Sequence, residues 1–155
     1  MSRAFVKERD GEDAVEDVPD RPISQHPNFV TADGLALIEA ELARVQAEHA
    51  AAQTANDRAG AARAARDLRY WNARRASAQV VPSRTDAAQV HFGSTVSIER
   101  DDGRRQTFRI VGEDEADPSR GTLSHVSPLA RALFGKGVGD TIRVGHSEVE
   151  IVGID

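Results

Sequence analysis

Apolar side chains recur at helical spacing between residues 31 and 81. Leu35, Ile38, Leu42 and Val45 follow one another at intervals of three, four and three residues. This spacing keeps one face of a helix turned toward a partner helix. Beyond Val45 the apolar seam weakens, because alanine and polar residues fill the next positions. The pattern predicts an antiparallel helical hairpin whose apolar contacts are concentrated at its base.

The same spacing continues in the second half of this stretch, at Ala64, Leu68 and Trp71. Between the two halves lies Asn56-Asp57-Arg58-Ala59-Gly60. Asparagine and aspartate favour turns and glycine interrupts helices, so we expect the chain to reverse here. Thr31 is a suitable N-cap for the first helix. Trp71 is interpreted as a core residue of the hairpin rather than as a platform for stacking a base.

After about residue 91 the apolar period changes from helical spacing to two, which is typical of half-buried strands. The alternating positions are Val96 and Ile98, Phe108 and Ile110, and Val149 and Ile151. Asp101-Asp102-Gly103 predicts a tight turn between the first two strands. A short helix is expected from Pro128 to Phe134, since proline fits the first turn of a helix. The predicted fold is therefore α+β: a coiled-coil arm followed by an antiparallel sheet with one short helix.

These patterns divide the chain into four segments. Residues 1–28 are acidic and poor in large apolar side chains, which predicts a mobile tail. Residues 29–81 form the arm, and residues 82–90, which begin with Pro82, are expected to be a linker. Residues 91–155 form the sheet domain.

Composition excludes several classes of site. The 155 residues include no cysteine, which rules out disulfides, thiol catalysis and cysteine-ligated zinc. No two of the five histidines are spaced as a helical metal site requires, so no metal site is expected. No long apolar run predicts a signal peptide or a membrane span, and we therefore expect a cytoplasmic protein that acts away from membranes. We also expect it to be a monomer.

Charge is unevenly distributed around the net value of −5. The first predicted helix is mostly acidic, whereas the second carries a cluster of arginines with few acids between them: Arg58, Arg63, Arg66, Arg69, Arg74 and Arg75. Two interpretations follow. The arginines pair with acids across the seam of the hairpin, or they form a basic face directed at phosphate groups.

Several segments resemble the bacterial Gre transcription elongation factor family. The resemblance covers residues 29–155 and is carried by FGSTVSIE (92–99), RIVGEDEADP (109–118), SPLARALFGKGVGD (127–140), VEIVGID (149–155) and the arm segments TADGLALIEAEL (31–42) and AQVV (78–81). It implies an FKBP-like C-terminal domain that docks on RNA polymerase at the rim of the secondary channel. The arm would then reach toward the polymerase active site.

The resemblance also implies a specific arm tip. In that family the tip carries an aspartate and, three residues later, a glutamate, and two carboxylates at that spacing can help to hold a second Mg²⁺. Asp57 matches the aspartate, but Gly60 stands in place of the glutamate. Asp57 is thus a lone catalytic candidate, and its alternative role is a cap for the second helix. The arm is also about two turns per helix shorter than the resemblance implies, a deficit of roughly 12 Å in reach.

The family's docking loop matches this chain at Ser127, Pro128, Leu129 and Arg131. Val126 stands where the family usually has a polar residue. The alternative is that this loop serves only to begin the short helix. A nearby acidic run is interpreted as a solvated turn: Glu113, Asp114, Glu115 and Asp117.

The resemblance therefore implies a transcription elongation factor that binds RNA polymerase and modulates elongation or pausing, with weak or no stimulation of transcript cleavage. It would not itself be an enzyme, and Mg²⁺ would be present only in complex with polymerase. The residues expected to face nascent RNA or the channel are Arg58, Arg63, Arg66 and Arg69. Three alternatives stay open: cleavage stimulation through Asp57, a relative of the regulator of nucleoside diphosphate kinase, and a peptidyl-prolyl isomerase, which the 5% content of aromatic residues disfavours.

Overall fold

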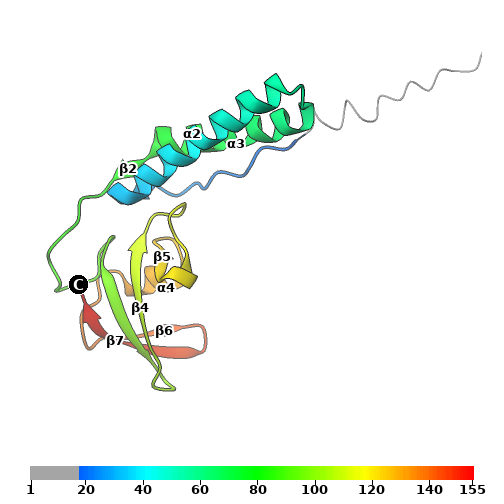
Figure 1. The fold of residues 1–155 in the computed structure, drawn as a ribbon. Coiled ribbons are helices and arrows are strands. Elements are labelled where there is room, and N and C mark those ends of the chain that lie inside the picture. Colours follow the sequence, from blue (N-terminus) through cyan, green and yellow to red (C-terminus); the bar gives the residue numbers. More distant parts are fainter. Residues whose placement is uncertain (1–17) are drawn as a thin grey trace, which may run out of the picture. The chain divides into compact units, whose positions relative to one another are not determined.

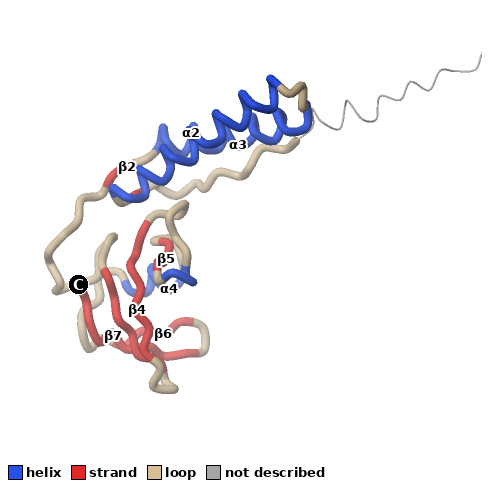
Figure 2. The backbone as a smooth tube through the Cα atoms, in the orientation of Figure 1, coloured by secondary structure: helices blue, strands red, loops and turns tan. Residues whose placement is uncertain are grey.

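The structure, a computed structural model, describes residues 18–155. Two long helices, α2 (Ala32–Thr54) and α3 (Arg58–Ser77), run antiparallel as the predicted hairpin (Figures 1 and 2). A parallel pair of two-residue strands, β1 (Phe29–Val30) and β2 (Gln79–Val80), flanks the two helices in sequence. Strands of two residues have no readable period, so the sequence did not predict them.

The hairpin seam is buried where apolar residues recur. Val45, Ala64 and Trp71 are buried, while the residues around the turn are exposed or half-exposed. Alanine has the highest helix propensity, so the outer part of the hairpin can stay helical with few apolar contacts. Arg74 is buried, with 1% of its surface exposed. The sequence did not indicate this burial, because no pattern distinguishes Arg74 from the other arginines of α3.

The C-terminal sheet contains five strands in the order β5-β4-β3-β7-β6. Their bounds are β3 (Thr95–Arg100), β4 (Arg105–Val111), β5 (Thr122–Ser124), β6 (Thr141–Val144) and β7 (Ser147–Ile154). Every pairing is antiparallel except that of β4 with β5, where the connection runs through the 3₁₀ helix η1 (Pro118–Arg120). The expectation of an antiparallel sheet thus holds for most of the sheet.

The core of this domain lies between the sheet and α4 (Pro128–Leu133). Val96 and Ile98 alternate with half-exposed neighbours on β3, as the period of two predicts, and both are fully buried. Ile110, Leu133 and Ile151 are also fully buried in the same cluster. Apolar burial on this scale is the main source of stability of the domain.

The chain forms two compact units. One contains residues 39–76 with the N-terminal approach up to Ser24, and the other contains residues 25–38 with 77–155. The predicted segment boundaries stay predictions, and the first seventeen residues of the expected mobile tail lie outside the described residues. Within residues 18–155, no helix combines the length and apolarity needed to cross a membrane.

Candidate functional site

The hairpin tip is built around Asp57. Asn56 adopts a left-handed conformation (φ 53°), which asparagine tolerates better than most residues, and ends the reversal after α2. The Asp57 carboxylate then accepts a hydrogen bond from the Gly60 N–H at 2.9 Å, and its carbonyl oxygen accepts one from the Ala61 N–H at 2.9 Å. The predicted role of Asp57 as the cap of the second helix is confirmed.

Gly60 allows this arrangement. A Cβ atom at Gly60 would overlap Oδ2 of Asp57 and lie 2.8 Å from its Cγ, so a side chain here would require the Asp57 carboxylate to rotate. The position expected to supply a second acid therefore carries no side chain, and Asp57 acts as the helix cap. Within residues 18–155, no group of three or more histidine, aspartate or glutamate residues is placed to hold a metal ion.

Next to the tip, the two helices leave an open depression of about 490 Å³. Alanines form much of its surface, and its charged residues are of both signs: Glu48, Asp57 and Asp67 against Arg63 and Arg66. Because acids and bases line it together, the depression has no dominant charge that would select an anion or a cation.

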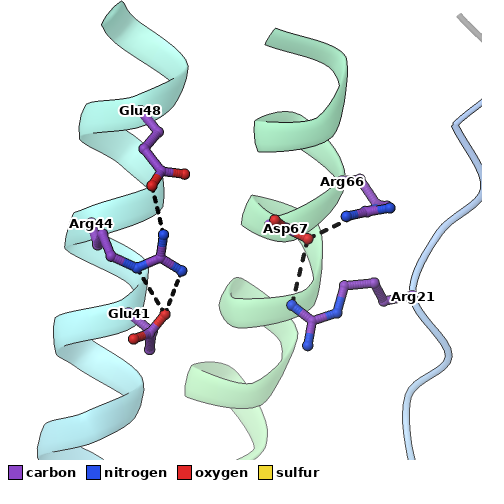
Figure 3. A network of polar contacts seen from close by, with 6 residues as sticks. All are labelled: Arg21, Glu41, Arg44, Glu48, Arg66 and Asp67. Atoms are coloured by element: carbon purple, nitrogen blue, oxygen red, sulfur yellow. Dashed lines mark hydrogen bonds and ion pairs between the residues drawn. The ribbon is translucent and has the colours of Figure 1, made fainter. Parts of the chain in front are cut away.

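Arg44 pairs with two acids of its own helix, α2. Arg44 donates to Glu41 at 2.6 Å and to Glu48 at 2.6 Å, and Figure 3 shows Arg44 between these two acids. The hydrogen bond to Glu41 is the main reason that the pKa of Arg44 is raised. Of the predicted contacts across the seam, Arg75 with Glu39 is present at 3.0 Å. The acids of α2 are therefore largely engaged by residues other than the four candidate arginines of α3.

Those four candidates, Arg58, Arg63, Arg66 and Arg69, lie along α3 in different surroundings. Arg58 and Arg63 are exposed near the tip. Arg66 is half-buried and donates to the neighbouring Asp67 at 3.2 Å. Arg69 is exposed and donates to Asp20 at 2.6 Å. The structure therefore places all four on one helix but does not show what they face.

The N-terminal approach contacts α3, which the sequence did not predict. Arg21 forms an ion pair with Asp67 at 3.5 Å, and its guanidinium carbon lies 3.8 Å from the centroid of the Tyr70 ring and 5.6 Å from that of Trp71. Trp71 is 8% exposed and meets Tyr70 edge-on, with 5.0 Å between the ring centroids. Trp71 is therefore a core residue, as predicted.

The α4 loop contains the residues expected to dock on a partner. Ser127 caps the helix by accepting a hydrogen bond from the Ala130 N–H at 3.3 Å, and Pro128 occupies the first turn. Pro128 and Arg131 are exposed, whereas Leu129 is partly buried against the core. Arg131 contacts His26 at 3.2 Å. The helix is confirmed, and docking through Ser127, Pro128, Leu129 and Arg131 stays a prediction.

The start of α2 is held by residues of the sheet domain. Thr31 accepts a hydrogen bond from the Gly34 N–H at 2.9 Å, confirming its role as N-cap, and donates to Glu115 at 2.7 Å. The expectation of a solvated acidic turn is thus wrong for Glu115, whose carboxylate is engaged by Thr31. Asp117 is also engaged, because it accepts a hydrogen bond from the Ser119 N–H at 3.1 Å and caps η1.

An aromatic cluster joins β1 to the segment before the α4 loop. The rings of Phe29, Phe92 and His125 contact one another edge-on, with centroids 5.5 to 6.2 Å apart. The Gly112 backbone approaches so closely that a Cβ there would lie 2.5 Å from the Phe29 carbonyl oxygen. No period or motif predicts this cluster, since its three members come from three separate segments.

The sequence comparisons with known proteins agree on one family. The family model "Transcription elongation factor, GreA/GreB, C-term" matches residues 85–155. The chain is 36% identical over 150 residues to transcription elongation factor GreA of Desulfovibrio desulfuricans, covering 93% of this chain and 89% of the relative. It is 42% identical over 96 residues to GreB of Neisseria meningitidis serogroup B, covering 58% and 59%. Among solved structures, the GreA/GreB factor of Nitrosomonas europaea aligns with 22% identity and a TM-score of 0.41, covering 82% and 98%.

Proposed function

The chain belongs to the GreA/GreB family of transcription elongation factors, and on this premise we propose that it binds RNA polymerase at the secondary channel and modulates elongation or pausing. We further propose that it adds little or no stimulation of transcript cleavage. The observation that carries the second part is the tip, where Gly60 replaces the second acid and Asp57 caps α3.

Binding is assigned to the α4 loop. Pro128 and Arg131 are exposed on a helix that Ser127 caps, and Leu129 fixes the helix to the core from its other side. A short helix with a capped start and a buried anchor presents its exposed residues in a fixed geometry. This pre-organisation lowers the entropy cost of docking.

The tip argues against a contribution to metal-dependent cleavage. Mg²⁺ requires near-octahedral coordination and is usually held by more than one carboxylate or phosphate oxygen. Asp57 offers one carboxylate, and that carboxylate already accepts a backbone hydrogen bond. A tip of this kind would occupy space near the polymerase active site without completing a cation site. The factor would then act by occupying the channel, and it would not be an enzyme.

The arginines of α3 are assigned to nascent RNA or to acidic residues that line the channel. Arg58 and Arg63 are exposed beside the tip, and guanidinium groups suit both phosphate and carboxylate partners. Since Glu39, Glu41 and Glu48 of α2 pair with Arg75 and Arg44, Arg58 and Arg63 are not the partners of these acids.

The binding test uses core RNA polymerase in a pull-down with the full chain. Ser127→Glu and Pro128→Ala are expected to weaken binding at least about tenfold, the range of a lost interface anchor. Ser147→Glu places the same change at the exposed first residue of β7 and should bind as the wild type does. Circular dichroism confirms that the variants are folded. Absence of wild-type binding at micromolar protein would contradict the proposal.

Cleavage stimulation through Asp57 is the alternative within the family. It is favoured by the exposed position of Asp57 at the tip and by the similarity to relatives named GreA. In this case a carboxylate of the polymerase would replace the missing acid. Stalled complexes that hold backtracked RNA distinguish the two: cleavage that the wild type accelerates and Asp57→Ala does not would favour the alternative. Cleavage that persists unchanged in Asp57→Ala would exclude a role for that carboxylate.

A further inference from the structure

The N-terminal strap, defined here as residues 18–24, is bound along α3 by contacts concentrated on one stretch of that helix. Asp20 accepts a hydrogen bond from Arg69 at 2.6 Å. Arg21 pairs with Asp67 at 3.5 Å and stacks over Tyr70, with its guanidinium carbon 3.8 Å from the ring centroid. Figure 3 shows Asp67 between Arg21 and Arg66. We propose that the strap is an autoinhibitory contact that competes with single-stranded RNA for the arginines of α3.

The strap matches the chemistry of the competitor. The Asp20 carboxylate accepts a hydrogen bond from the Arg69 guanidinium, as an RNA phosphate oxygen would. While Asp20 holds Arg69, the charge of that arginine is offset by a carboxylate and its Nε–H donor is occupied. Strap displacement therefore opens one of the four arginines assigned to RNA.

The contact is specific rather than a general attraction of acid for base. Asp20 and Arg21 are neighbours of opposite charge, and each meets its opposite on α3: Asp20 meets Arg69, and Arg21 meets Asp67. The pair brings no net charge to the helix. The binding of the strap to α3 therefore depends on the register of the two ion pairs and on the stacking of Arg21 over Tyr70. Substitutions that keep the net charge of the strap unchanged can remove both.

The strength of the contact suits a displaceable element. The Asp20 and Arg69 side chains are 69% and 55% exposed, and exposed ion pairs contribute little individually and are screened by salt. The stack of Arg21 on Tyr70 adds a modest cation–π attraction. A single-stranded RNA that places several phosphates along α3 gains contacts with more than one arginine. Such a ligand can displace the strap.

This inference rests on the proposed RNA-facing role of α3. Its test measures the affinity of the full chain for a short fluorescein-labelled oligouridine. Fluorescence anisotropy at a fixed, low salt concentration reports the binding. The double variant Asp20→Asn with Arg21→Gln removes both ion pairs and leaves the net charge unchanged. We expect it to bind the RNA at least about threefold more tightly than the wild type. The gain in affinity equals the reciprocal of the fraction of wild-type molecules in which the strap is released from α3. Arg69→Gln should weaken binding in both backgrounds.

Trp71 provides a second readout, because it is the only tryptophan of the chain and the Arg21 guanidinium carbon lies 5.6 Å from its ring centroid. The double variant should change Trp71 emission in the absence of RNA, and oligouridine added to the wild type should shift its emission toward that of the variant. A control with Glu150→Gln, an exposed acid of the sheet domain, should leave emission unchanged.

Two results would overturn the inference in different ways. If the wild type and the double variant bind RNA equally while Arg69→Gln weakens both, the strap does not compete, and the RNA-facing role of α3 survives. If neither binds RNA, the strap inference and the RNA-facing role fail together. The polymerase pull-down, which is measured separately, then shows whether the rest of the proposed function holds.

Discussion

The sheet domain and the outer half of the hairpin are held together by different forces. In the sheet domain Ile98, Ile110 and Ile151 are fully buried in one apolar cluster. The outer hairpin relies on alanine helix propensity, a capped turn at Asp57 and exposed ion pairs. The family model matches residues 85–155, the part of the chain that contains this apolar cluster. The difference teaches that this chain can keep a tightly packed sheet domain while its tip departs from the pattern that the resemblance implies.

The largest expected effect separates the two regions directly. Ile98→Ala removes a fully buried side chain from the sheet core and should lower the free energy of unfolding by about 2–5 kcal/mol. Ala52→Gly in the outer half of α2 should cost only about 1 kcal/mol, the difference in helix propensity. Urea unfolding followed by circular dichroism measures both. Equal costs would mean that the tip is packed as tightly as the core.

A second substitution tests the residue that links α2 to the sheet domain. Thr31→Val keeps the shape of the side chain but removes the cap of α2 and the hydrogen bond to Glu115, at an expected cost of about 2 kcal/mol. Thr54→Val is the matched control, since the exposed Thr54 hydroxyl donates to the Ala50 carbonyl in its own helix. The control should stay within about 0.5 kcal/mol. Equal unfolding midpoints for the two variants would show that the buried contact contributes nothing.

At the tip, two substitutions of Asp57 separate capping from charge. Asp57→Ala should destabilise the hairpin by about 1 kcal/mol, because the Gly60 N–H loses its acceptor. Asp57→Asn keeps a capping oxygen without the charge and should differ little from the wild type. Trp71 fluorescence reports the transition, since this residue lies on α3. If Asp57→Asn lowered the free energy of unfolding as much as Asp57→Ala does, the effect would be due to the charge of Asp57 and not to capping.

The smallest effect concerns the exposed turn between β3 and β4. The backbone N–H of Arg104 donates a hydrogen bond to the Asp102 carboxylate at 3.0 Å. This hydrogen bond is the main reason that the pKa of Asp102 lies below its ordinary value of 3.8. A lowered pKa in the folded state stabilises the protein above the unfolded value, and this contribution is lost as the pH falls through the folded pKa. An NMR titration of the Asp102 carboxyl carbon should therefore give a midpoint below 3.8. A midpoint at or above that value would contradict this assignment.

Much of the fold could be predicted because it follows from local rules. The apolar seam of the hairpin and the period of two on β3 each identify an element, and Thr31, Asp57 and Ser127 cap helices as their residue types favour. The pairing of β1 with β2 was missed, because two residues carry no period. The parallel pairing of β4 with β5 was missed as well, since it depends on the path of the chain through η1.

The candidate site could be predicted only in part. The tip followed from Asp57 and Gly60, whose local roles are visible in sequence. The contacts of Arg21 with Asp67 and of Thr31 with Glu115 join residues 46 and 84 positions apart. No spacing rule connects single residues at such distances. Opposite charges in the N-terminal segment and on α3 were the only available signal, and they did not specify the pairs.

The most direct test of the central claim is transcript cleavage in backtracked elongation complexes to which both a cleavage-active GreA-type factor and increasing amounts of this chain are added. A factor that docks but has an incomplete tip should slow the cleavage driven by the active factor in proportion to its occupancy, and it should add none when present alone. The account would be contradicted if this chain alone accelerated cleavage and Asp57→Ala abolished that acceleration.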